Sequence, residues 1–300
     1  MQIQRLIVGV DFSPSSQVAV ARAAELAATH GAELVLVHAG TVPETPEVPP
    51  SMAATRDAYL AVLQDQLAAD RARLAQLHAD LVARGVQASQ VIVDRFPDDA
   101  LVEAADEFKA DLILTGTRDA GERHGHGRWR LGKVTAKVVR AAHTSVLCAR
   151  AGDPDHGFSR IVVGTDFSDA AAHALALAVA VAAPGATIEV VHALQVGRWP
   201  EAVATPVRLV DDHPIRVELA AALEARGAAL LAPYQGRDVT LSFRVGFDEP
   251  HVAVRAAALA AEADLVAVGG VGHRGLRRWL LGSVAEDILA DAPCSVLIAR

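Results

Sequence analysis

The sequence predicts an α/β fold in which parallel strands alternate with helices, and it predicts this unit twice in one chain. Three observations lead there. Short β-branched runs alternate with longer helical runs, blocks of sequence recur after 150 to 155 positions, and a glycine-rich segment follows a strand near the end of the chain. Alternating strands and helices with short connections imply open parallel sheets with right-handed crossovers.

The recurrence is the first of these observations. Residues 5–13, which end in Asp-Phe-Ser, return as 160–168, and residues 145–150 return as 295–300. A period of this length is a whole domain and not a unit of a solenoid. The sequence therefore predicts one domain at 1–150, a polar linker rich in turn residues at 151–158, and a second domain at 159–300.

The elements of the first repeat can be placed in order. Apolar runs without alternation are typical of parallel strands covered on both faces, and Ser-Pro starts and glycine ends are typical of helices. We expect strands at 6–10, 34–38, 90–94, 112–115 and 145–149, and helices at 14–30, 53–84, 98–109 and 134–142. The second repeat follows the same order. Its apolar run 174–183 predicts a buried helix, and its segment 199–214 gives little signal.

Composition excludes several classes of protein. The chain is 52% hydrophobic with a formal net charge of −8, which suits two buried cores and argues against nucleic acid as a partner. Its two cysteines do not form a disulfide framework, so a reducing cytoplasm is expected. No apolar run is long enough to span a bilayer, and Asp11 interrupts the first one, so neither a membrane span nor a secretory signal is expected.

A glycine pattern near the C-terminus points to phosphate binding. Gly269, Gly272 and Gly282-Ser283 form G-x2-G-x9-G-S between a strand-like and a helix-like run. Glycine lets backbone N–H groups approach a phosphate closely, and the start of a helix offers unpaired N–H groups to the same anion. The pattern is not a P-loop, because it has no G-K-[ST].

Together these motifs resemble the universal stress protein family in its tandem form, over nearly all 300 residues. The resemblance rests on the Thr-Asp-Phe-Ser of 165–168, the Val-His-Ala of 191–193, the glycine pattern, and the closing segment 292–297. The family often has proline where Ser295 stands. The resemblance implies two open parallel five-stranded sheets of order 3-2-1-4-5 flanked by helices, in a Rossmann-like fold of the adenine nucleotide alpha-hydrolase-like type. In one branch of the family it also implies bound ATP, with or without Mg²⁺.

The resemblance carries roles to the second repeat. Asp166 would hold the ribose or orient its surroundings, and the backbone of the strand ends would meet the adenine. The glycine pattern and the helix start would line the phosphate path. The implied nucleotide-binding residues are Gly164, Thr165, Asp166, Ala193, Val268, Gly269, Gly272, Gly282, Ser283, Val284 and Ala285.

The first repeat departs from this pattern. Gly116 and Gly132 are 16 positions apart, against 13 for Gly269 and Gly282 in the second repeat. Asp119 stands near the second glycine and would repel a polyphosphate, whereas Lys133, which replaces the serine, would attract one. We therefore expect at most one tightly held ATP per chain, in the second repeat.

Several features also have a purely structural interpretation. Asp11 and Asp166 suit helix capping, and for Asp166 this is compatible with ribose binding. His38 and His192 end matched apolar strands, which favours packing over chemistry. The histidines at 124 and 126 lie in a glycine loop without paired cysteines or carboxylates, so no metal site is expected there.

Three functions remain open at this stage. No nucleophile elbow and no metalloprotease motif occurs in the sequence, so no catalytic residue is assigned. The chain is expected to be a cytoplasmic stress-response module that binds ATP and acts by regulation or interaction, with protein partners that the sequence does not identify. The alternatives are a slow ATPase and a nucleotide-free scaffold. The matched segments 145–149 and 295–299 are expected to pair antiparallel, giving an internal pseudo-dimer, and the sequence specifies no further homodimer.

Overall fold

The computed structural model describes residues 1–40, 53–117, 132–150, 157–194, 214–271 and 281–300. We refer to residues 1–150 as the first half and to residues 157–300 as the second half. The first half contains β1 (Arg5–Gly9), α1 (Pro14–His30), β2 (Glu33–Ala39), α2 (Ala53–Ala83), β3 (Ala88–Val93), α3 (Pro97–Phe108), β4 (Leu112–Gly116), α4 (Lys133–Ala141) and β5 (Ser145–Ala149). The second half contains β6 (Phe158–Gly164), α5 (Asp169–Val181), β7 (Ala182–Ala193), α6 (Pro214–Leu231), the 3-10 turn η2 (Ala232–Tyr234), β8 (Val239–Gly246), α7 (Pro250–Ala260), β9 (Leu265–Gly269), α8 (Ser283–Asp291) and β10 (Ser295–Ala299).

The strands form one ten-stranded sheet of order β3-β2-β1-β4-β5-β10-β9-β6-β7-β8. Each half has the predicted order 3-2-1-4-5, and every pairing within a half is parallel. The expected antiparallel pairing of the two fifth strands is confirmed, because β5 pairs with β10 with Leu147 opposite Leu297. The two five-stranded sheets are therefore joined into one continuous sheet, as the expected pairing of the fifth strands implies.

Matched serines stabilise this junction. The hydroxyl of Ser295 accepts the backbone N–H of Arg150 at 2.9 Å, and the hydroxyl of Ser145 accepts that of Arg300 at 3.1 Å. Each hydrogen bond crosses from one half to the other, and both serines are buried. This gives a physical reason for a serine at position 295, where proline would supply no hydroxyl.

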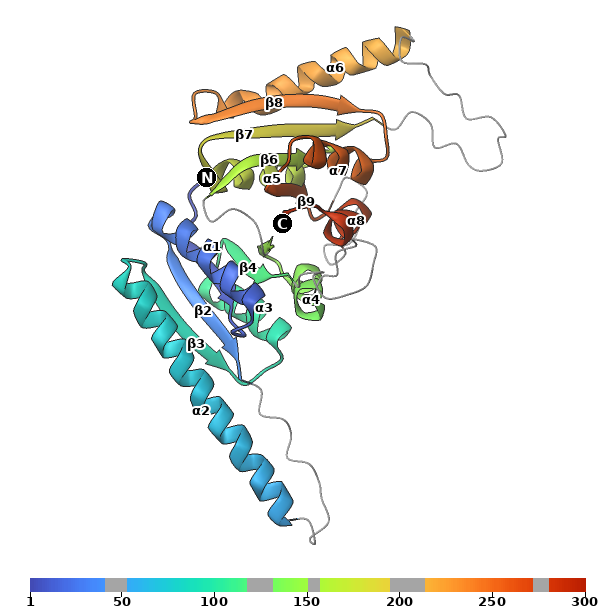
Figure 1. Ribbon diagram of the computed structural model, residues 1–300. Helices are drawn as coiled ribbons and strands as arrows, with labels where there is room; N and C mark the ends of the chain where they lie inside the picture. The colour runs from blue at the N-terminus through green and yellow to red at the C-terminus, as the bar shows by residue number, and fades with distance from the viewer. Residues whose placement is uncertain (41–52, 118–131, 151–156, 195–213, 272–280) are drawn as a thin grey trace, which may run out of the picture.

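Two apolar layers cover the sheet, and each extends through both halves. One layer includes residues of α1, α2 and α5, such as Val20, Leu74 and Leu175. The other includes residues of α3, α4, α7 and α8, such as Leu101 and Ile288. In each half the sheet thus has helices on both faces, as the unbroken apolar strands predict (Figure 1).

Local sequence explains the helix ends. Ser13 caps α1 by accepting the N–H of Ser16, Pro14 occupies the first turn, and Gly31 ends the helix with φ 64°. The predicted buried helix in the second half is α5, but it ends at Val181. The last two residues of the predicted run begin β7 instead, because Ala182 pairs with Phe158.

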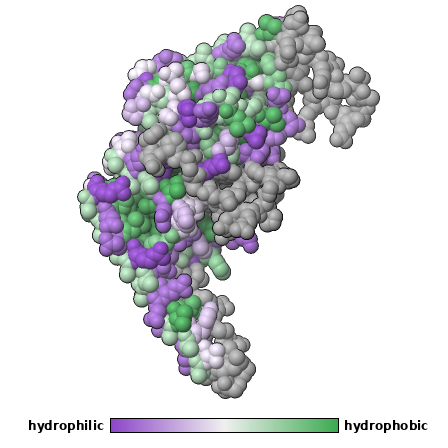
Figure 2. Space-filling view, viewed as in Figure 1, coloured by the Kyte–Doolittle hydropathy of each residue, from purple (hydrophilic) through white to green (hydrophobic). Residues whose placement is uncertain are grey.

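Helix α2 extends past the end of the sheet (Figure 1). Its C-terminal part packs on the sheet, with Leu74 and Leu81 buried. Tyr59 and Val62, nearer its start, are 43% and 63% exposed, and Figure 2 shows hydrophobic side chains among polar ones on this outer part of the helix. The packing of α2 on the sheet therefore depends on the C-terminal part of the helix.

Candidate functional site

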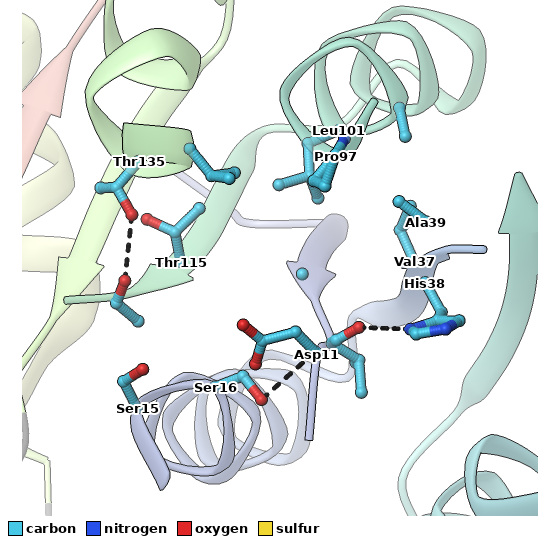
Figure 3. Close-up of a pocket in the computed structure, with 15 residues that line it drawn as sticks. Asp11, Ser15, Ser16, Val37, His38, Ala39, Pro97, Leu101, Thr115 and Thr135 are labelled. Carbon is cyan, nitrogen blue, oxygen red and sulfur yellow. Dashed lines mark hydrogen bonds between the residues drawn. The ribbon is translucent and has the colours of Figure 1, made fainter. Parts of the chain in front are cut away.

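A cavity of about 130 Å³ lies in the first half, at the carboxyl ends of β1, β2 and β4 (Figure 3). Helices α3 and α4 border it on one face of the sheet. The strand order reverses between β1 and β4, which is where open α/β sheets bind ligands. The lining residues are Gly9, Val10, Asp11, Ser15, Ser16, Val37, His38, Ala39, Pro97, Ala100, Leu101, Thr115, Gly116, Val134 and Thr135.

Asp11 lies where β1 leads into α1. Its Oδ1 accepts hydrogen bonds from the backbone N–H of Ser13 at 2.9 Å and from the Ser13 hydroxyl at 2.5 Å. Burial raises the pKa of Asp11, but hydrogen bonds from Ser13 and Ser16 together lower it by more. The pKa of Asp11 therefore lies below its ordinary value. Asp11 is therefore a carboxylate at neutral pH, and it stabilises the turn before α1.

Phe12 and Phe167 follow the two aspartates and share an unusual backbone conformation. Their φ angles are 61° and 60°, in the left-handed region that residues other than glycine rarely adopt. Arg73 of α2 lies over the Phe12 ring at 4.1 Å, and Arg226 of α6 lies over the Phe167 ring at 4.2 Å. These contacts connect each strained turn to the long helix of its half.

The two matched histidines are packed in the same way. His38 Nδ1 lies 2.7 Å from the carbonyl oxygen of Val10, and His192 Nδ1 lies 2.8 Å from that of Thr165. Their rings contact Phe12 and Phe167 with centroid separations of 5.2 and 4.7 Å. These contacts favour the structural interpretation, in which each histidine joins the ends of two neighbouring strands.

Two threonines give the inner end of the cavity its polarity. The Thr135 hydroxyl donates to the carbonyl of Gly116 at 3.0 Å. Thr115 is 4% exposed, and its hydroxyl has no oxygen or nitrogen hydrogen-bond partner among the described residues. Its polar neighbour is the Cys148 thiol, a weak partner, and burial raises the pKa of that thiol to about 12. The Thr115 hydroxyl is therefore a buried polar group whose polar neighbour is a thiol.

The residues predicted to bind nucleotide occupy the matching positions of the second half. Gly164 ends β6 as Gly9 ends β1, Ala193 ends β7 as Ala39 ends β2, and Gly269 ends β9 as Gly116 ends β4. By the same correspondence, every predicted residue at the strand ends and in the first turn of α8, except Ser283, matches a residue that lines the first-half cavity. These residues are Gly164, Thr165, Asp166, Ala193, Val268, Gly269, Val284 and Ala285.

The strand and the helix that flank the glycine pattern are joined directly. Gly282 precedes α8, and its backbone N–H donates to the carbonyl of Gly270 at 2.8 Å. The first turn of α8, starting at Ser283, is thereby held beside the end of β9. Gly272 and the three arginines within 274–278 lie outside the described residues, as do Asp119 and the histidines at 124 and 126.

Sequence reasoning concentrated on the second half and missed the hydroxyl-bearing lining of the first. Thr115 and Thr135 stand where the second half has Val268 and Ala285. The recurrence of 112–116 as 265–269 could have revealed the first exchange. Within the described ranges there is no cluster of three or more potential metal ligands and no helix long and apolar enough to cross a membrane.

Comparison with known proteins agrees with this architecture. The model of the universal stress protein family matches residues 2–150 and again residues 157–300. The chain belongs to the universal stress protein family. A universal stress protein of Mycobacterium tuberculosis (strain ATCC 25618 / H37Rv) is 30% identical over 317 residues, covering 98% of this chain and 96% of the relative. A second one from the same strain is 29% identical over 300 residues, with the same coverage.

Solved structures share the fold over the whole chain. A universal stress protein from Archaeoglobus fulgidus superposes with a TM-score of 0.68 at 18% identity, covering 100% of this chain and 99% of the other. One described as putative, from Pseudomonas aeruginosa, gives 0.65 at 19% identity, covering 99% and 93%. At these identities the likeness concerns the fold, including the tandem arrangement of this universal stress protein.

Proposed function

We propose that this universal stress protein is a regulatory module of the cytoplasm that binds ATP in its second half and acts through partners. The observation that carries the proposal is the correspondence between the two halves. The residues implied to bind adenine nucleotide match positions that border an open cavity in the first half. The same backbone frame therefore supports a ligand site at the ends of β6, β7 and β9.

The phosphate end of the proposed site is the start of α8. A helix start presents unpaired N–H groups and the positive end of the helix dipole, both of which favour a phosphate. Gly282 and Ser283 bring this helix start beside Gly269 at the end of β9, through the hydrogen bond between Gly282 and Gly270. The Ser283 hydroxyl adds one donor to those of the backbone.

Asp166 supplies the recognition of the sugar in this proposal. Its Oδ1 accepts the backbone N–H of Ser168 at 2.9 Å, which fixes the carboxylate at the end of β6. A fixed carboxylate is a good acceptor for ribose hydroxyls, since hydrogen bonds to charged groups are stronger than neutral ones.

The experiment is a titration of the full chain with ATP, after any co-purifying nucleotide has been identified by mass spectrometry and removed. We expect one ATP per chain. Asp166→Asn keeps the shape but removes the charge, and should weaken ATP binding about tenfold or more. The matched variant Asp11→Asn in the first half is the control and should leave ATP affinity unchanged.

Two results would contradict the proposal. One is the absence of ATP binding, and the other is ATP binding that responds to Asp11→Asn and not to Asp166→Asn. Release of phosphate from bound ATP, measured in the same samples, would instead favour the slow ATPase.

A further inference from the structure

We propose that the outer side of α7 is a contact surface for a second copy of this chain, in which the two α7 helices pack antiparallel about a two-fold axis near Ala256. This surface, called here the α7 face, consists of Val252, Ala256, Leu259 and Ala260. It is the side of the helix turned away from the sheet, so the inference does not rest on the proposed function.

The α7 face is apolar and open to solvent. Val252 and Leu259 are 43% and 49% exposed, and Ala256 and Ala260 are exposed as well. Their spacing places all four on one side of the helix, whereas the buried residues of α7, such as Val254, lie on the other. Figure 2 shows hydrophobic side chains, with hydrophilic ones around them, where α7 lies in Figure 1.

The matching helix of the first half carries the opposite chemistry on its outer side. The buried residues of α3 and α7 correspond one to one, beginning with Ala100 and Ala253, so their outer sides correspond too. In place of the four residues of the α7 face, α3 has Asp99, Glu103, Asp106 and Glu107. A helix at this place in the fold therefore does not need an apolar outer side, and a continuous apolar face on α7 indicates a surface that a partner covers.

The order of side chains along the α7 face suits an identical helix as the partner. Val252 and Leu259 are nearly equidistant from Ala256, so in an antiparallel pair centred there each valine lies opposite the leucine of the other copy. The two alanines then meet at the crossing point, where small side chains let the helix axes approach closely. A two-fold axis makes such a surface its own complement.

The charges at the two ends of α7 agree with antiparallel packing. The arrangement opposes the two helix dipoles and places the N-terminal end of each helix, with Glu249, against the C-terminal end of the other. Arg160 lies at that C-terminal end, where its guanidinium pairs with the carboxylate of Glu262 at 3.3 Å. In the dimer each Arg160 therefore lies between a carboxylate of its own chain and one of the second copy.

The contrast between α7 and α3 also limits the assembly to two copies. An apolar outer side on both helices would give each chain two adhesive surfaces and allow an open array, whereas one self-complementary surface closes at a dimer. Helix α7 has 11 residues and is about 16 Å long. The contact is therefore smaller than stable interfaces, which bury about 1,200 Å² or more, and we expect a dimer that dissociates on dilution.

Sedimentation velocity of the full chain, freed of nucleotide, tests the contact. We expect a shift from monomer to dimer between about 1 µM and about 500 µM, the range of weak association. The double variant Val252→Asp/Leu259→Asp gives α7 the residues of α3 and should weaken association about tenfold or more, because it places carboxylates in the contact. Val217→Asp makes the same change at an exposed valine of α6 and should leave association unchanged. Thermal unfolding checks that the variants fold.

A cysteine near the proposed axis tests the geometry of the pair. Ala256→Cys should give a disulfide-linked dimer on mild oxidation, because the two-fold axis brings position 256 of both copies together. Glu103→Cys, at the matching position of α3, is the control and should give no covalent dimer. The native Cys148 and Cys294 are buried, so they do not compete for the oxidant.

Three results would overturn the proposal. A chain that stays monomeric at the highest concentration would leave the α7 face to a different protein or to a membrane surface. A dimer that survives the double substitution on α7 would have to use another surface. Equal cross-linking through positions 256 and 103 would remove the distinction between α7 and α3. Because nucleotide is absent from these samples, none of the results depends on whether the second half binds ATP.

Discussion

The two halves keep the same backbone frame and differ in the side chains that face the ligand edge. Both retain a glycine at the end of the first strand, an aspartate, a left-handed phenylalanine and a serine cap, and in both a histidine joins two strand ends. The residues between the helices at this edge carry hydroxyl groups in the first half, at Thr115 and Thr135, and are aliphatic in the second half, at Val268 and Ala285. The residues that determine the backbone conformation are the same in the two halves, whereas residues that line the strand ends between the helices differ.

A second difference concerns how the long helix of each half meets the sheet. In the first half the side chain of Leu74, on α2, is buried in the core between the helix and the sheet. The matching residue of α6 is Gly227, and a Cβ there would lie 2.3 Å from the ring of Phe243 on β8. At this contact the first half has a large side chain on the helix, Leu74, whereas the second half has glycine on the helix and the ring of Phe243 on the strand.

The largest expected effect tests the spacing between the first helix and the fourth strand. A Cβ on Gly116 would lie 2.2 Å from the backbone oxygen of Ser15, whereas one on Gly269 would lie 3.0 Å from the backbone of Ala170. Gly116→Ala should lower the free energy of unfolding by about 3 kcal/mol or more, and Gly269→Ala by about 1 kcal/mol. Urea denaturation of both variants measures the two losses of free energy. Equal losses would contradict the expectation that the contact at Gly116 is the tighter one.

The next effect tests whether the junction between the halves is symmetric. Ser145→Ala and Ser295→Ala each leave one backbone N–H of the opposite strand without its acceptor. Each should lower the free energy of unfolding by about 1 to 2 kcal/mol. Thermal unfolding compares them, with Ser159→Ala on β6, which contacts neither β5 nor β10 in the strand order, as a control for the loss of a serine hydroxyl. A loss confined to one of the two variants would contradict the symmetry.

The third expected effect is a smaller change in the free energy of unfolding, and its sign depends on the background. It tests the contact between Gly227 of α6 and Phe243 of β8. Replacing a helix-interior glycine by alanine normally gains about 1 kcal/mol, but overpacking against Phe243 should cost about 1 to 3 kcal/mol. Gly227→Ala should therefore be destabilising in the wild-type background and stabilising in a Phe243→Ala background. The double-mutant cycle measures this coupling, and additive effects would show that the ring moves aside freely.

The smallest effect concerns the charge of the turn in the first half. Hydrogen bonds to Asp11 lower its folded-state pKa below 3.8, so its charged form stabilises the fold above about pH 4. That contribution is lost as pH falls through the folded-state pKa. Because Asp11 is exposed, Asp11→Asn should cost no more than about 0.5 kcal/mol at pH 7. Unfolding from pH 7 to pH 2 should show this difference vanish, and a difference that persists at pH 2 would implicate shape instead of charge.

The sequence was sufficient for the fold because its signals are local and occur twice. Strand Ser145–Ala149 was predicted with its observed bounds, and the helix that begins at Pro14 follows from a serine cap and a proline. The end of α5 was misplaced because an apolar alanine run continues into β7 without a helix-ending residue. There the pairing of Ala182 with Phe158, a long-range contact, outweighs local preference.

The lining of the site was harder to predict than its frame. The family resemblance assigned Gly164, Asp166 and Gly269 to the predicted nucleotide site, and in the structure Gly164 and Gly269 end strands, with Asp166 following soon after β6. Thr115 looks like an ordinary strand residue, and only the arrangement of β4, β5, α3 and α4 shows that its hydroxyl is buried without an oxygen or nitrogen partner. Such information depends on three-dimensional neighbours that are distant in sequence.

The antiparallel pairing of β5 with β10 also determines what the chain would become if it were cut at its linker. Each fragment would expose a mainly apolar strand that is buried in the intact chain, with unpaired backbone groups, and such edges associate. Pairing between two fragments depends on their concentration, whereas pairing within one chain proceeds at an effective concentration on the order of millimolar. The duplication has thereby converted an association that dilution would reverse into one that is independent of protein abundance. The two halves remain paired at any expression level, and each is free to diverge in the side chains at its strand ends.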